Sequence, residues 1–151
     1  MNNIKSDLYL ENNSSKAPAI ELLLKLGYQY ISPMKCMEMR GNLYNVLLKD
    51  ILRSQIHKLN QFTYGDITYK FTSENVERAI NELDEPLTDG LIRTSEKIYN
   101  SIMLGKSYPE KLVDGTSKSF NLRYIDWEYP ENNVFHVTEE FSCDSWDKQK
   151  N

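Results

Sequence analysis

The length, composition and charge of the chain exclude several classes of protein. Its 151 residues suffice for one domain with one sizeable core, and 40% hydrophobic with 26% charged residues is ordinary for a globular protein. The net charge of −4 lacks the basic surplus that is usual in nucleic-acid binders, so if the chain serves a DNA enzyme, most of the DNA binding must lie elsewhere. The sequence has no signal peptide and no apolar run near the ~18 residues of a membrane span, so we expect a cytoplasmic protein without membrane contact.

The N-terminal part of the chain predicts a flexible arm followed by a helix. Residues 1–15 are polar and rich in Asn and Ser, which favours the arm. The first helix follows this arm, with Pro18 in its opening turn and Gly27 as its left-handed C-terminal cap. Residues 28–31 then predict a short extended segment, and Pro33 predicts a turn.

Three further helices and a hairpin are expected in the middle of the chain. Residues 43–59 keep helical spacing of their apolar side chains, and residues 62–71 place Gly-Asp between aromatic and β-branched residues as in a small hairpin. A third helix is predicted over residues 73–85. A fourth is predicted over residues 88–104, closed by Gly105.

The hydrophobic period changes from 3.6 to 2 near the end of the chain, which predicts strands. Residues 119–127 and 134–141 are expected to pair across a loop at residues 130–133, and residues 143–151 to form a disordered tail. The predicted class is therefore α+β, with about four N-terminal helices followed by a C-terminal antiparallel strand pair. Because two strands rarely form a stable sheet alone, we expect further strands beyond the chain.

Nucleophilic and metal-binding patterns are absent from the sequence. Cys36 and Cys143 fit no zinc or CxxC spacing and are interpreted as free thiols. His57 and His136 lie in no HxH or HxxxH arrangement. Without a GxxxxGK[ST] phosphate loop, we expect no ATP site of that kind in this chain.

The residues that precede the lysines argue against a complete restriction-type nuclease site. Such sites use two acids to hold Mg²⁺ and a lysine in an acid–x–Lys pattern. No lysine here has Asp or Glu two positions before it, and the nearest pattern, at residues 38–40, ends in arginine. Acidic clusters at residues 126–131 and 139–140 are interpreted as solvated loops rather than metal sites. We therefore expect that the chain does not complete such a site by itself.

Three stretches resemble the restriction (R) subunit of type I restriction–modification enzymes. IELLLKLGYQY at residues 20–30 is similar to the family's first helix and following extended segment. RGNLYNVLLKDILR at residues 40–53 resembles the family's stretch ending in VLLKD, and RYIDWEYPENNVF at residues 123–135 resembles its "IDF…PENNDF" hairpin. Because the three occur in the family's order, we assign residues 16–142 to the N-terminal part of an R-subunit nuclease domain.

The resemblance implies a truncated, restriction-endonuclease-like fold of the PD-(D/E)xK type. The complete subunit uses Mg²⁺ for DNA cleavage and ATP for translocation, and it works with methylation and specificity subunits. Its PD and ExK segments are expected after Asn151, so no position here inherits their roles. Glu21 matches an accessory glutamate near the metal site, and Lys49 with Arg53 is a candidate DNA-phosphate contact; the alternative for all three is a solvated helix face.

Two alternatives remain open beside an enzyme fragment that is inactive alone. One is a non-enzymatic interaction protein that binds the methylation and specificity subunits or mimics DNA, which the acidic balance favours. The other is a self-contained nuclease with an unorthodox site built on Glu21, Asp126 and Glu131.

Overall fold

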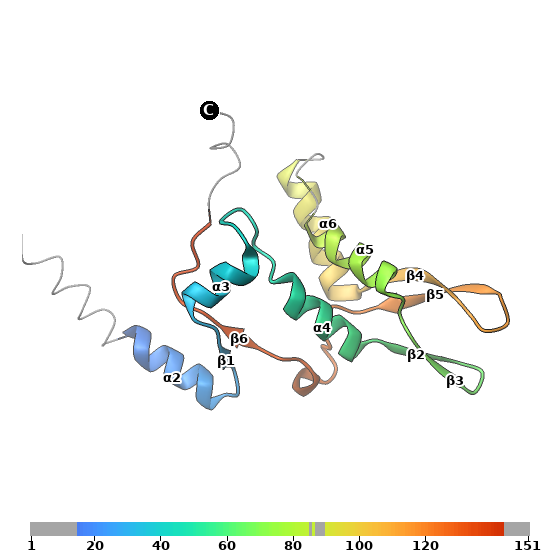
Figure 1. Ribbon diagram of the computed structural model, residues 1–151, viewed down its shortest axis with the longest axis horizontal. Helices are drawn as coiled ribbons and strands as arrows, with labels where there is room; N and C mark the ends of the chain where they lie inside the picture. Colours follow the sequence, from blue (N-terminus) through green and yellow to red (C-terminus); the bar gives the residue numbers. More distant parts are fainter. Residues whose placement is uncertain (1–14, 85, 87–89, 144–151) are drawn as a thin grey trace, which may run out of the picture. The chain divides into compact units, whose positions relative to one another are not determined.

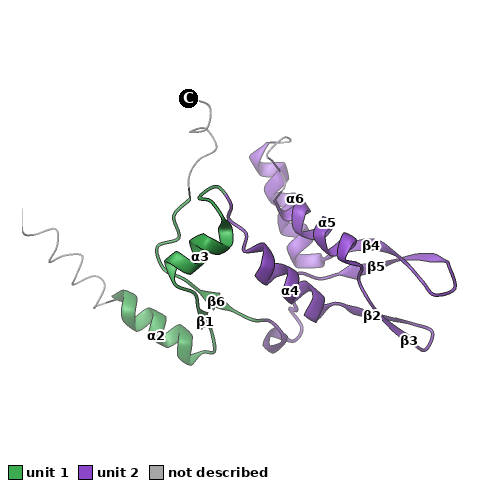
Figure 2. Cartoon of the chain, in the orientation of Figure 1, with its two compact units in different colours: residues 1–44, 134–151 green, residues 45–133 purple. Residues whose placement is uncertain are grey.

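A computed structural model describes residues 15–84, 86 and 90–143. Most of the predicted arm, nearly all of the predicted tail and the predicted start of the fourth helix at Thr88 lie outside these residues. The chain divides into two compact units, one formed by residues 1–44 and 134–151 and the other by residues 45–133 (Figure 2). Both units combine helices with strand pairs, which confirms the α+β class. The assignment of residues 16–142 to one nuclease domain stays a prediction.

Among its described residues, the first unit contains two α-helices and a short parallel strand pair (Figure 1). Helix α2 (Ala17–Lys25) is followed by Gly27, whose φ of 92° confirms the predicted left-handed position. Strand β1 (Gln29–Tyr30) pairs in parallel with β6 (His136–Val137). Backbone hydrogen bonds within this unit thus join two segments, β1 and β6, that lie near opposite ends of the sequence.

Helix α3 (Pro33–Arg40) was not predicted, because Pro33 was interpreted as a turn. Proline fits the first turn of a helix, where its missing N–H costs nothing. The Ser32 hydroxyl caps this helix by accepting a hydrogen bond from the Lys35 N–H, and Gly41, with φ of 76°, ends it. Its polar and apolar residues do not separate into two faces, so the spacing gave no signal.

The second unit begins with helix α4 (Lys49–Leu59), which starts six residues later than predicted. The hairpin of β2 (Gln61–Tyr64) and β3 (Ile67–Lys70) follows and confirms the predicted turn at Gly65-Asp66. Next comes helix α5 (Ser73–Leu83), which confirms the predicted third helix and is capped by Thr72. The unit continues with α6 (Leu91–Leu104), the hairpin of β4 (Lys106–Lys111) and β5 (Ser117–Leu122), and the 3-10 turn η2 (Pro130–Asn132).

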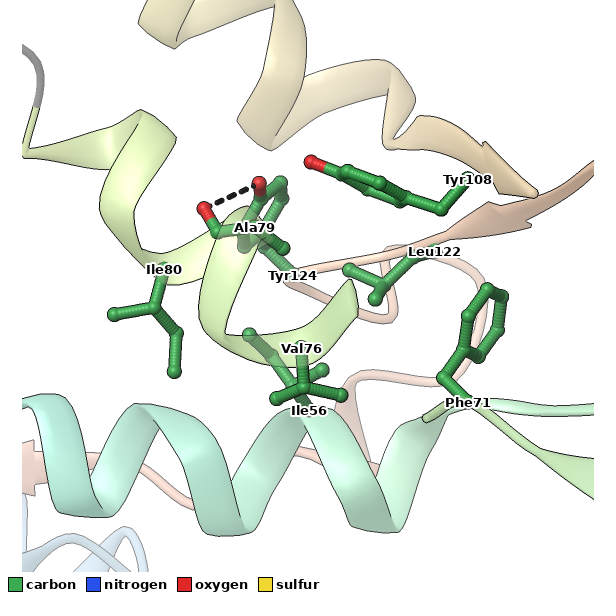
Figure 3. Close-up of a cluster of buried hydrophobic side chains, with 8 residues drawn as sticks. All are labelled: Ile56, Phe71, Val76, Ala79, Ile80, Tyr108, Leu122 and Tyr124. Carbon is green, nitrogen blue, oxygen red and sulfur yellow. Dashed lines mark hydrogen bonds between the residues drawn. The ribbon is translucent and has the colours of Figure 1, made fainter. Parts of the chain in front are cut away.

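The core of the second unit lies where α4 and α5 meet strands β4 and β5 (Figure 3). Ile56 from α4 and Ile80 from α5 are fully buried there, as is Leu122 from β5. The Tyr124 hydroxyl donates to the Ala79 carbonyl at 2.9 Å, so this buried polar atom is satisfied. The complete set of buried core residues is Ile56, Phe71, Val76, Ala79, Ile80, Tyr108, Leu122 and Tyr124.

The pairing of the last strands differs from the prediction. The segments at residues 119–127 and 134–141 do not pair with one another, because β5 pairs with β4 and β6 pairs with β1. Strand β4 escaped prediction since its sequence, KSYPEK, combines charged residues with a proline. Pro109 is exposed, and Tyr108 and Glu110 beside it are buried, so the strand alternates despite its composition.

None of the helices in the described part of the chain is long and apolar enough to span a membrane.

Candidate functional site

Glu21 lies on α2 and lines an open cavity of about 670 Å³ in the first unit. Its carboxylate forms an ion pair with Lys25 at 2.8 Å, one turn later on the same helix, and both side chains are exposed. Exposed pairs of this kind contribute little to stability, so the carboxylate can exchange this partner at small cost. The lining of the cavity includes the apolar residues Ala17, Ile20, Leu24 and Pro33.

Opposite charges meet on the polar side of the same cavity. The Lys16 ammonium contacts both Glu139, at 2.8 Å, and Glu140. The Tyr30 hydroxyl donates to Glu139 at 2.8 Å. The hydrogen bond from Lys16, followed by that from Tyr30, lowers the pKa of Glu139 below its usual value. The sequence had marked the acidic pair but not its partners, because they lie at the other end of the chain.

Asp126, in the IDWEYPENN stretch, organises the loop that follows it. Its carboxylate accepts hydrogen bonds from the backbone N–H of Tyr129 at 3.1 Å and the Asn132 amide at 2.9 Å. Arg123 lies 3.5 Å from the same carboxylate. The Asn132 hydrogen bond, then that from Tyr129, lowers the pKa of Asp126. Asn133 completes the network, since its side chain bonds both the N–H and the carbonyl of Asp126.

This network leaves Asp126 poorly suited to a metal ion, because both carboxylate oxygens already accept protein donors. Glu131 is exposed on the same loop. Among the residues that the structure describes, no group of three His, Cys, Asp or Glu side chains could hold a metal ion. The predicted alternative site that combines Glu21 with Asp126 and Glu131 draws on both units and stays a prediction.

The predicted DNA contacts on α4 are engaged with acids of their own unit. Lys49 forms an ion pair with Asp84 at 2.6 Å. Arg53 binds Asp50 and also Glu77, with its Nη2 atom 3.1 Å from a Glu77 oxygen. Hydrogen bonds to these acids, that of Glu77 first, raise the pKa of Arg53. A phosphate would have to compete with these carboxylates.

Arg40 is a buried charged residue whose contacts could not be predicted from the sequence. It is buried at the end of α3 and donates to the carbonyls of Ser142, at 2.8 Å, and Leu43, at 2.9 Å. Its guanidinium lies 4.0 Å from the ring centre of Phe141. The acid–x–arginine pattern noted at residues 38–40 thus belongs to a helix that fixes residues 141–142 within the unit, and not to a strand with a catalytic cation.

Together these features define a mixed α+β protein in which conspicuous charged side chains bind one another and no metal centre is assembled among the described residues. Over residues 8–151 the sequence matches the family described as type I restriction enzyme R protein N terminus, and the chain belongs to this family. The resemblance found in the three sequence stretches is thereby confirmed, and it places the chain in type I restriction systems. Neither curated proteins nor solved structures gave a match.

Proposed function

We propose that this chain forms the N-terminal part of the restriction subunit of a type I restriction–modification enzyme, where it frames a PD-(D/E)xK nuclease domain. The family match over residues 8–151 is the observation that supports this proposal. In the complete enzyme, foreign unmethylated DNA would be cleaved with Mg²⁺ after ATP-driven translocation. The methylation and specificity subunits would be its partners.

The chain's own residues are proposed to shape the nuclease domain rather than to perform the cleavage. No lysine in the sequence follows an acid at the acid–x–Lys spacing, and the described acids do not fit a Mg²⁺ centre. Glu21 remains the candidate accessory acid, because it lines an open cavity and its ion-pair partner Lys25 is exposed. We assign no step of DNA cleavage to this chain alone.

Co-purification tests the proposed assembly. The full chain is expressed with the methylation and specificity subunits of the same system, and the specificity subunit carries the affinity tag. We expect the chain to be retained with the complex through several washes. An acidic protein of similar size serves as the control for non-specific retention, and loss of the chain at the control's rate contradicts the proposal.

A second candidate is a non-enzymatic protein that occupies the place of the complete R subunit. It is favoured by the net charge of −4 and by the ion pairs that engage Lys49 and Arg53, which suit a protein partner better than DNA. Addition of excess chain to the active enzyme separates the two candidates. A competitor would reduce DNA cleavage in proportion to its concentration, whereas unchanged cleavage would remove this candidate.

A further inference from the structure

A small cavity in the first unit brings a thiol and a guanidinium together. Its volume is about 180 Å³, and its lining comes from helix α3, from Leu43 and from residues 138–142. Cys36 and Arg40 both line the cavity, and both residues are buried. Since they are four residues apart on α3, they lie on the same side of the helix, one turn from each other. The cavity wall therefore combines a nucleophilic sulfur with a fixed positive charge.

Thr138 adds a hydroxyl to the same cavity. Its Oγ1 atom is buried and has no hydrogen-bond partner among the residues that the structure describes. Most buried polar atoms in folded proteins have a partner, so an orphaned one at a cavity indicates a small polar guest. Water fits this description, and so does hydrogen peroxide, which forms the same kinds of hydrogen bond and is larger by a single oxygen atom. Of these two guests, peroxide is the one that reacts with a thiol.

The second cysteine of the chain contacts the same guanidinium. The Arg40 Nη2 atom donates a hydrogen bond to the Cys143 sulfur at 3.5 Å. Both cysteines are free thiols, of which Cys36 is buried and Cys143 is exposed. They come from opposite ends of the sequence, and the fold of the first unit places each of them beside Arg40. A sulfur that is oxidised in the cavity thus has a second thiol nearby, which is the arrangement that redox-sensing cysteines use.

We propose that this cavity is a peroxide-reactive site, in which hydrogen peroxide oxidises Cys36 and Cys143 then forms a disulfide with it. The Thr138 hydroxyl holds the peroxide by a hydrogen bond. The Arg40 guanidinium stabilises the negative charge that moves from the sulfur to the leaving oxygen. This inference does not rest on the proposed function, because it uses only contacts within the first unit.

The reaction has two steps, with hydrogen peroxide as the oxidant. In the first step the Cys36 sulfur attacks one peroxide oxygen, the S–O bond forms as the O–O bond breaks, and the departing hydroxide takes the thiol proton as water. The sulfur gives two electrons to the peroxide and becomes a sulfenic acid. In the second step the Cys143 sulfur leaves Arg40 and attacks Cys36, and its proton departs with the sulfenic hydroxyl as a second water. The product is a covalent link between α3 and residue 143.

The test is the oxidation of the purified full chain by one equivalent of hydrogen peroxide. Both thiols, counted with a chromogenic disulfide reagent after denaturation, should disappear and should return with dithiothreitol. The intact mass should fall by two hydrogen atoms, and the product should remain a monomer on a non-reducing gel. Oxidation should be roughly tenfold faster or more than that of the glutathione thiol at the same pH. A rate no greater than that of glutathione, or a disulfide between two chains, overturns the proposal.

Two variants assign the steps to their residues. Cys143→Ser should stop the reaction at the sulfenic acid, which dimedone then labels at Cys36. Thr138→Val keeps the shape of the side chain and should slow oxidation of Cys36 by about two- to tenfold, the effect of one lost hydrogen bond. Thr68→Val makes the same change at an exposed position of β3 and should leave the rate unchanged.

The outcomes of these variants decide the site. A Thr138→Val chain that reacts at the wild-type rate, or a Cys143→Ser chain without dimedone label at Cys36, overturns the proposal. Circular dichroism shows whether each variant folds. If Thr138→Val does not fold, the wild-type rate and the position of the dimedone label still decide between a built site and two ordinary thiols.

Discussion

Two buried polar side chains take the place of backbone hydrogen bonds where regular structure ends. Asn60 follows α4, donates to the carbonyls of Ile56 and Arg123 at 2.8 Å each, and accepts from the Arg123 N–H at 2.7 Å. In the loop before β6, the Asp126 carboxylate accepts hydrogen bonds from the Tyr129 N–H and the Asn132 amide. Buried polar groups need such partners, so these residues are more important to the fold than their polarity suggests.

Asp126→Asn should make the stability of the chain less dependent on pH. The pKa of the Asp126 carboxyl is lowered in the folded state, so its contribution is complete above the unfolded value of ~3.9 and is lost as the pH falls through the folded pKa. Thermal unfolding followed by circular dichroism should give the variant a lower melting temperature at pH 7, with a difference that shrinks toward pH 3. Glu131→Gln on the same loop is the matched control, and a pH-independent difference argues against this role.

Helix α5 is the element whose beginning the structure explains most fully. The carboxylate of Glu110, buried on β4, accepts hydrogen bonds from the Thr72 N–H at 2.9 Å, the Thr72 hydroxyl at 3.1 Å and the Asn75 amide at 2.8 Å. A negative charge at a helix N-terminus is favourable, and here it comes from a strand distant in sequence. This contact therefore joins the β4–β5 hairpin to the helix.

Glu110→Ala should lower the free energy of unfolding by about 1–3 kcal/mol, because it removes three hydrogen bonds to a buried carboxylate, two from Thr72 and one from the Asn75 amide. Urea denaturation measures the effect. Glu110→Gln should lose less, since its amide oxygen still accepts. Lys111→Ala, exposed on the same strand, should stay within about 0.5 kcal/mol of wild type. If Glu110→Ala has the same midpoint of urea denaturation as the wild-type chain, the proposed capping contact does not stabilise the fold.

Local sequence patterns predicted those elements that local interactions determine. Helix α5 was expected over residues 73–85, and the β2–β3 hairpin followed from the Gly65-Asp66 turn. Helix α3 lacks a distinct apolar face, so only its Ser-Pro start and Gly41 could have indicated it. Strand partners are decided by contacts between distant segments, which is why the pairing of β1 with β6 could not be read from alternation.

For the whole molecule, the functional prediction came from the resemblance to a family. Residue spacing showed that the acid–x–Lys pattern is missing from the sequence. The sequence identified Glu21 and the acids at residues 139–140, but not that Lys16 and Tyr30 would bind Glu139 beside the same cavity. It also proposed DNA contacts on α4, where the structure pairs both cations with acids. Ion pairs between distant segments depend on tertiary structure and leave no periodic signal.

We propose that the chain contributes to a nuclease domain but does not contain the catalytic site. Incubation of the purified full chain with supercoiled plasmid and Mg²⁺, with and without EDTA, tests it most directly. We expect the plasmid to remain supercoiled under both conditions, because the acids do not assemble a metal centre among the described residues. Mg²⁺-dependent cleavage that Glu21→Ala abolishes, and that the control Glu38→Ala leaves unchanged, would contradict this proposal.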